Sequence, residues 1–304
     1  MIIKNYKKLI FTFLTFFIFC FFIFVICESV LRIVSSSKNH NLSFNHNYHE
    51  QLGWINPKKT INYIKKMDYQ STVSINSLGL RNKEIGIKKK KRVGIFGDSM
   101  TQAIQVNDDK TFTYLLDEML DQYEVINFGV SGYGTYQNYL MYEIIGKKLD
   151  LDIVIVAFAF NDIFDNSLKL QKAEGQSKIE ISKRPFIDFS DTVEVKTLPK
   201  EVIEKKTIKA KLSETFYFYN FLREVKNLII EVYWPLLSEK RLKVTMLKRD
   251  EMRKAFFERF KEKEYIEAWE LTEKILEKFK KSVSKNNSQL HIVSMPIEPI
   301  DENN

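Results

Sequence analysis

The longest apolar stretch of the chain runs from Leu9 to Cys27 and contains no charged residue. Its length suits a helix that crosses the roughly 30 Å hydrocarbon layer of a bilayer, so the pattern predicts a transmembrane helix. Three lysines lie among the first eight residues, and positive flanks stay on the cytoplasmic side. We therefore expect residues 1–34 to form a cytoplasmic tip and a single anchor, with the remainder extracytoplasmic. A cleaved signal peptide is the alternative, but no small-x-small pattern follows the apolar run.

Short apolar strands alternate with helical patterns from Val93 onward. The pattern predicts strands over 93–96, 125–128 and 153–160, helices over about 112–120 and 135–148, a charged amphipathic helix over 251–281, and a last core strand over 290–295. Within the first helix, apolar residues recur at i, i+3, i+4, i+7 and i+8, which indicates one buried stripe. Strands that alternate with helices favour an α/β fold with a three-layer, doubly wound parallel sheet.

The segments around this core have different patterns. Residues 35–91 are expected to form a juxtamembrane linker, over 35–48, and a small β extension with short alternating stretches between Leu52 and Arg81. Residues 92–304 form the α/β domain, interrupted over about 167–250 by a helical insertion. The insertion carries a dense aromatic stretch over 216–222. Ordinary packing is the usual role of such a stretch, and lining an acyl or sugar site is the alternative.

Composition narrows the function classes. With 304 residues, of which 44% are hydrophobic, the chain can bury a core. Both cysteines, Cys20 and Cys27, lie in the apolar segment, so no disulfide is expected inside the exported domain. The formal charge of +8 comes with no nucleic-acid motif, and nucleic-acid binding is not expected. The linker histidines His40, His46 and His49 lack a carboxylate or thiol framework, so they are interpreted as solvated polar residues and not as a metal site.

Polar residues follow three of the predicted strands directly. Asp98 and Ser99 come after strand 93–96, Gly129 after 125–128, and Asn161 and Asp162 at the end of 153–160. The carboxyl ends of parallel strands meet at one edge of the sheet, where such folds place their functional residues. A serine hydroxyl, a backbone amide at a glycine and an asparagine side chain at this edge would suit acyl transfer. The pattern indicates Ser99 as nucleophile, with its own N–H, Gly129 and Asn161 as donors to the oxyanion.

The same residues resemble the SGNH hydrolases, also called the GDSL esterase family. Residues 97–101 (Gly-Asp-Ser-Met-Thr) resemble the first family block, residues 127–134 (Asn-Phe-Gly-Val-Ser-Gly-Tyr-Gly) the second, and residues 159–162 (Ala-Phe-Asn-Asp) the third, whose usual glycine is alanine here. The segments 52–54 and 75–81 are similar to those preceding the core in membrane-anchored bacterial members. The resemblance implies Ser99 as nucleophile, Gly129 and Asn161 in the oxyanion hole, Asp98 and Asp162 in supporting positions, and neither metal nor organic cofactor.

The fourth family block, D-x-x-H, supplies acid and base and does not follow the last predicted strand, where residues 301–304 are Asp-Glu-Asn-Asn. Three explanations stay open: the chain is a truncated or interrupted copy of a longer enzyme, it is an inactive relative that still binds an acylated ligand, or His49 folds back as the base. His291, inside the predicted strand 290–295, is expected to be an ordinary strand residue.

The resemblance implies ester hydrolysis or O-acyl transfer at the extracytoplasmic face of a membrane. The expected partners are an acylated glycan or lipid substrate and the membrane that holds the amino-terminal helix. The alternative is a catalytically inactive, membrane-tethered binding protein on the same fold.

Overall fold

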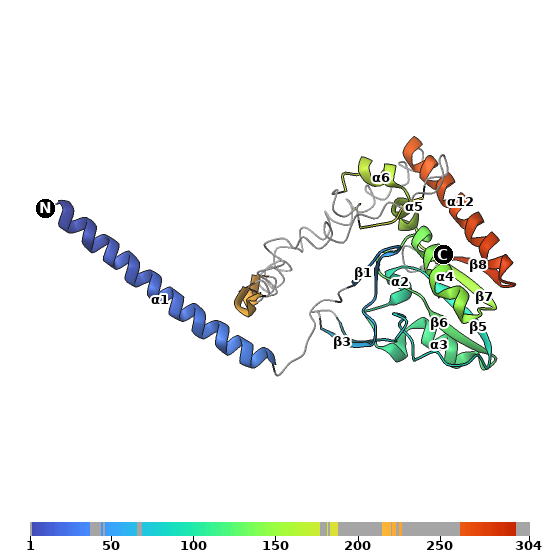
Figure 1. Ribbon diagram of the computed structural model, residues 1–304, viewed down its shortest axis with the longest axis horizontal. Coiled ribbons are helices and arrows are strands. Elements are labelled where there is room, and N and C mark those ends of the chain that lie inside the picture. Colours follow the sequence, from blue (N-terminus) through green and yellow to red (C-terminus); the bar gives the residue numbers. More distant parts are fainter. Residues whose placement is uncertain are drawn as a thin grey trace, which may run out of the picture. The chain divides into compact units, whose positions relative to one another are not determined.

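The computed structural model of the chain is drawn in Figure 1. It describes residues 2–36, 44, 46–65, 69–176, 181, 183–187, 215–219, 221, 222, 225, 226 and 262–295. The chain forms two compact units, one made of residues 1–39 with 205–254 and the other of residues 40–204 with 255–304. Each unit is described separately. Most of the predicted insertion over 167–250, the start of the predicted helix 251–281 and the tail 301–304 lie outside the described residues.

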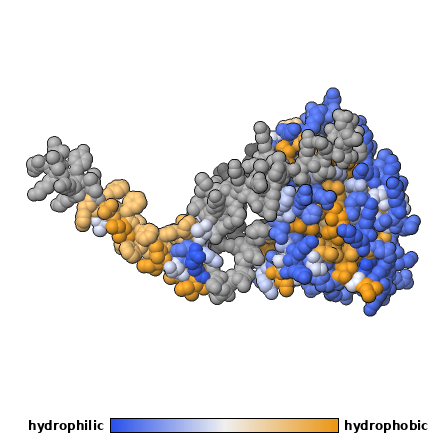
Figure 2. All heavy atoms as spheres, in the orientation of Figure 1, coloured by the Kyte–Doolittle hydropathy of each residue, from blue (hydrophilic) through white to orange (hydrophobic). Residues whose placement is uncertain are grey.

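The first unit is dominated by helix α1 (Ile2–Ser36). Its stretch Phe11–Ile33 is long and apolar enough, by length and composition, to cross a membrane, and it is the one such helix in the described part of the chain. Figure 2 shows the hydrophobic residues that line this helix along its exposed surface. Exposed apolar side chains are costly in water, so a membrane-spanning role agrees with the predicted anchor. The orientation of the anchor stays a prediction.

The second unit begins with two antiparallel hairpins. Strand β1 (Asn47–His49) pairs with β2 (Gly53–Ile55), and β3 (Thr60–Lys65) pairs with β4 (Gln70–Ile75). These strands agree with the β extension that alternation and turn residues indicated. The linker prediction over 35–48 was wrong at its end, because Asn47 and Tyr48 belong to β1 and pair across the hairpin with β2.

A four-stranded, wholly parallel sheet follows, in the order β6–β5–β7–β8. Its strands are β5 (Lys91–Phe96), β6 (Tyr123–Asn127), β7 (Ile153–Phe158) and β8 (Gln289–Ser294). The helical elements between them are α2 (Ser99–Gln102), η1 (Asp108–Lys110), α3 (Phe112–Met119), α4 (Thr135–Ile144), η2 (Gly146–Leu149), α5 (Asn161–Asn166), α6 (Leu168–Ala173) and α12 (Lys263–Lys285). The mixed α/β fold with a parallel sheet is therefore confirmed. The finer description, a three-layer doubly wound sheet of SGNH type, stays a prediction.

Side chains of the central strands alternate between two apolar clusters, as a strand period of two requires. Val93 and Ile95 of β5 pack in one cluster with Phe112 and Leu116 of α3. Phe96 joins the other cluster, which includes residues of α4 and α12. Its ring stacks on Phe128 with centroids 4.1 Å apart and meets the edges of Tyr142 and Phe279.

Two sequence predictions about burial were wrong. The apolar stripe predicted along α3 is narrower than expected, because Leu115, Met119 and Leu120 are exposed while Phe112 and Leu116, one turn apart, contact the sheet. The last strand, β8, was expected in the core, yet Ile292 and Val293 are exposed. The cause is position, since β8 is the edge strand and pairs only with β7.

Candidate active site

Ser99 lies on the turn that leaves the carboxyl end of β5. Asp98 caps helix α2, and its Oδ1 accepts the N–H of Met100 at 2.9 Å. Gly97 leaves no room for a side chain, since a Cβ there would lie 2.1 Å from Oγ1 of Thr101. Ser99 is half-buried, and among the described residues its hydroxyl has no hydrogen-bond partner. The serine is therefore presented on a tight, capped turn.

Backbone and side-chain hydrogen bonds join the three strand ends. The N–H of Val130, after β6, donates to the carbonyl of Gly97 at 3.1 Å. The Nδ2 of Asn161, after β7, donates to Oδ2 of Asp98 at 3.3 Å. The three polar segments that the sequence placed at strand ends are thus in direct contact around the turn that carries Ser99.

Asn161 is the first residue of helix α5, and its amide is held by carboxylates. In addition to Asp98, its Nδ2 donates to Oδ2 of Asp165 at 3.0 Å. Asp165 forms an ion pair with Arg184 at 2.8 Å. Burial raises the pKa of Asp165, while the charge of Arg184 and the hydrogen bond from Asn161 act in the opposite direction. Both amide hydrogens of Asn161 therefore have acceptors in this structure.

Gly129 is buried, and its environment explains why the position needs glycine. A Cβ there would lie 2.3 Å from the backbone N of Gln102 and 2.6 Å from the carbonyl carbon of Thr101. The N–H of Gly129 donates to Oδ1 of Asn127 at 2.8 Å. Donation to an oxyanion would require this hydrogen bond to open, so the role given to Gly129 by the sequence stays a prediction.

Asp162, the second supporting residue, is buried next to Asn161. Its Oδ2 accepts the hydroxyl of Thr135 at 3.0 Å, whereas its Oδ1 has no partner. Burial raises the pKa of this carboxyl well above 3.8, and the nearby charges of Asp98 and Asp165 act in the same direction. A neutral Asp162 is the consequence, and it avoids a third negative charge beside Asn161.

A buried polar network from the β extension also reaches the site. Nε2 of Gln102, at the end of α2, donates to Oδ1 of Asn56 at 2.7 Å, and Oε1 of Gln102 accepts the N–H of Ser131 at 2.8 Å. Nε1 of Trp54 donates to the carbonyl of Ser131 at 3.0 Å. The sequence gave these residues no role, because their partners are between 29 and 77 positions away.

Arg81 extends this support to the far end of helix α2. Its guanidinium donates to the carbonyls of Gln102 and Ala103 at 2.7 and 2.5 Å. Ala103 adopts a left-handed conformation (φ 54°), which a residue with a Cβ rarely does, and its N–H closes the turn onto the carbonyl of Ser99. Arg81 therefore fixes the turn that begins with the candidate nucleophile.

None of the described histidines hydrogen-bonds Ser99. Nδ1 of His49 accepts the N–H groups of Gln51 and Leu52 at 3.3 and 3.2 Å, so this atom is engaged in a local turn. Burial lowers the pKa of His46 to about 4. His40 lies outside the described residues, and within the described ones no His, Cys, Asp or Glu group could hold a metal ion.

His291 is also placed away from the serine. It lies opposite Ile155 in β7, which in turn lies opposite Ile95 in β5. At about 3.3 Å per residue, His291 is on the order of 10 Å short of Ser99 along the strands, and two strand spacings of about 4.8 Å to the side. His291 is an exposed residue of the edge strand.

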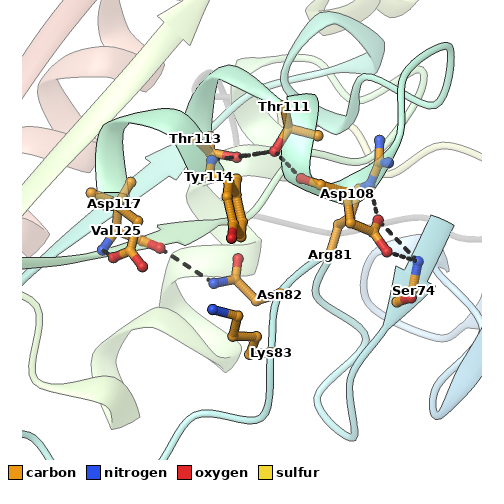
Figure 3. Close-up of a pocket in the computed structure, with 10 residues that line it drawn as sticks. All are labelled: Ser74, Arg81, Asn82, Lys83, Asp108, Thr111, Thr113, Tyr114, Asp117 and Val125. Atoms are coloured by element: carbon orange, nitrogen blue, oxygen red, sulfur yellow. Dashed lines mark hydrogen bonds and ion pairs between the residues drawn. The ribbon is translucent and has the colours of Figure 1, made fainter. Parts of the chain in front are cut away.

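A cavity of about 280 Å³ lies on the other side of Arg81. Figure 3 shows Arg81 and Ser74 meeting the carboxylate of Asp108, while Asn82 donates to the carbonyl of Val125. Ser99 does not line it. Its acidic and basic side chains balance, and most of its polar groups already have partners, so the cavity gives no sign of a ligand.

Three solved structures are similar to part of the chain. They are AlinE4, an SGNH-hydrolase family esterase (20% identity over 32% of this chain and 50% of that chain, TM-score 0.23), the acetyl xylan esterase AlAXEase (28%, 30%, 47% and 0.22), and a point mutant of AlinE4 (18%, 44%, 75% and 0.23). The chain thus spans about half the length of the first two. No protein-family model and no curated protein matches it. TM-scores near 0.2 carry no structural argument, so the interpretation of the site depends on its own geometry.

Proposed function

We propose that this chain is a membrane-anchored serine ester hydrolase or O-acyltransferase with a three-layer, doubly wound α/β domain of SGNH type. Ser99 is the nucleophile, and the anchor helix keeps the domain at the extracytoplasmic face. The substrate is an acyl ester carried by a glycan or a lipid of the envelope. Nucleic acid, metal and organic cofactor take no part.

The hydrogen bond between Asn161 and Asp98 carries this proposal. It connects the ends of two neighbouring strands, β5 and β7, next to Ser99. An asparagine amide close to a serine on a capped turn is the arrangement that acyl transfer needs, because the amide can donate to the oxygen that becomes negative. The contact between Val130 and Gly97 supports the same convergence from β6.

In the proposed reaction, Oγ of Ser99 attacks the ester carbonyl and its proton passes to a base. The carbonyl oxygen becomes an oxyanion that accepts hydrogen bonds from the N–H of Ser99, from Asn161 and from Gly129. Collapse of the intermediate expels the alcohol and leaves an acyl-enzyme, which water or a second hydroxyl group then attacks. Exclusion of water at this stage separates a transferase from a hydrolase.

The geometry sets two requirements for this chemistry. One amide hydrogen of Asn161 must leave Asp98 or Asp165, and the N–H of Gly129 must leave Asn127. A proton acceptor must also reach Ser99, and it is none of the histidines in the described part of the chain. These requirements favour a second candidate, a membrane-tethered binding protein in which the same loops hold an acylated ligand without cleaving it.

Labelling with a fluorophosphonate probe separates the two candidates. The full-length protein in detergent is incubated with the probe, together with Ser99→Ala and Ser284→Ala, the latter removing an exposed serine of α12. The esterase proposal expects labelling of the wild type and of Ser284→Ala, and none of Ser99→Ala. Absence of labelling in all three proteins overturns the esterase proposal and supports the binding protein. Equal labelling of Ser99→Ala overturns the assignment of the nucleophile.

A further inference from the structure

The aromatic stretch that the sequence left between packing and ligand binding contacts the anchor helix. The described part of this stretch, residues 215–219, 221 and 222, is called the aromatic segment below, and it belongs to the same compact unit as α1. On the helix, Phe24, Glu28 and Arg32 are spaced four residues apart and so lie on one face. This face lies in the last turns of the apolar stretch Phe11–Ile33.

Charged groups of the helix bind the backbone of the aromatic segment. Glu28 accepts the N–H groups of Tyr217 and Phe218 at 3.1 and 2.8 Å. Arg32 donates to the carbonyl of Thr215 at 2.7 Å and pairs with Glu28 at 2.8 Å. Glu28 is only 8% exposed. The ion pair is thus consumed inside the unit, which removes most of the cost of placing charges close to a bilayer.

Aromatic rings complete the contact. The ring of Phe24 meets Phe216 and Phe218 edge to face, with centroids 5.6 and 5.5 Å apart. The guanidinium of Arg32 lies over the ring of Tyr217, 5.3 Å from its centroid. The contact therefore combines hydrogen bonds, an ion pair and ring packing along two turns of the helix.

The aromatic segment still exposes apolar side chains. Phe221 is 43% exposed and Leu222 is 49% exposed, beside a helix whose Ile26, Val30 and Ile33 are exposed as well. This apolar surface continues the surface that the spanning helix presents to lipid. Aromatic and aliphatic side chains placed at the end of a membrane span suit the boundary between acyl chains and headgroups.

We propose that the aromatic segment is a second membrane-contacting element, which lies in the bilayer interface at the carboxyl end of α1 and is fastened there by Glu28 and Arg32. Its occupant is the lipid interface itself. The inference depends on the proposed anchoring by α1. It assigns the aromatic stretch to the membrane and not to the acyl site.

Nitroxide accessibility in vesicles tests this placement. Cys20 and Cys27 are changed to serine in the full-length protein, and single cysteines are introduced by Phe221→Cys, Phe17→Cys and Ile61→Cys. Each is labelled in phosphatidylcholine/phosphatidylglycerol vesicles, and collision with oxygen, which dissolves in lipid, is compared with collision with a water-soluble nickel chelate. Phe17 reports on the middle of the anchor. Ile61 of β3 is the matched control, an apolar residue that is 62% exposed in the other unit.

We expect the oxygen-to-nickel ratio at position 221 to be several-fold higher than at position 61 and lower than at position 17. Glu28→Ala should lower the ratio at 221 toward that at 61 and leave 17 unchanged. A ratio at 221 equal to that at 61, or a probe that neither reagent reaches, overturns the inference while the anchor stands. A low ratio at 17 overturns the anchoring, and the inference with it.

Discussion

Replacing Arg81 by methionine tests whether the β extension holds the serine turn in place. Arg81 is only 5% exposed and uses five N–H donors. One hydrogen bond goes to Oδ1 of Asp108 at 3.0 Å, and the others go to the carbonyls of residues 72, 102, 103 and 106 at 2.5–3.3 Å. Methionine fills similar space but leaves these carbonyls and the carboxylate without their donor.

The expected loss is large because a buried charge leaves its partner behind. Breaking a buried ion pair by removing one member costs about 3–5 kcal/mol, and we expect Arg81→Met to lower the free energy of unfolding by about this amount. Arg81→Lys keeps the charge but has only three donors, so a loss of about 2 kcal/mol is expected. Lys83→Met is the control. Its side chain is exposed and lies over the ring of Tyr114, which is worth about 0.5–1 kcal/mol.

Urea unfolding of the full-length protein in detergent, followed by near-ultraviolet circular dichroism, measures these differences from the transition midpoints and slopes. The rate of fluorophosphonate labelling, measured in the absence of urea, should fall in parallel for Arg81→Met, because the turn that begins at Ser99 loses its carbonyl cap. A difference below about 1 kcal/mol between Arg81→Met and wild type, the size of an average substitution, would refute the reasoning.

Three further perturbations address the site itself. Asn161→Ala should slow labelling of Ser99 about 10²–10³-fold, the cost of one oxyanion donor, with little change in the urea midpoint since the side chain is exposed; unchanged labelling would exclude Asn161 as a donor. Asp162→Asn replaces a carboxyl whose pKa is raised well above 3.8 by burial. Folding favours its protonated form, so wild-type stability should fall as the pH rises from about 4 toward the raised pKa. The variant should lack this fall, and parallel stability curves would contradict the prediction. Gly129→Ala puts a Cβ 2.3 Å from a backbone atom and should destabilise by at least about 1–3 kcal/mol, whereas Gly86→Ala, where a Cβ meets nothing within 4 Å, should not; equal midpoints for the two would show that the loop can yield.

Local patterns were enough for the elements of the core. The amphipathic spacing after residue 111 and the apolar runs ending at 96, 127 and 158 correspond to α3 and to the three neighbouring strands β5, β6 and β7. The same patterns misjudged β8, because an edge strand and a central strand can have the same apolar sequence. Periodicity also overestimated the buried stripe of α3, since it cannot tell how much of a helix face its neighbours cover.

The sequence by itself determined which polar residues follow each strand, because the order of strands and turns is a local property and parallel strands share one edge. Only the tertiary structure decided what those residues bind. Asn161 donates to Asp98 and Asp165, the N–H of Gly129 is taken by Asn127, and Arg81 closes the turn after Ser99. A hydrogen-bond partner depends on which distant segments the packed core brings within about 3 Å, and no short stretch of sequence contains that information.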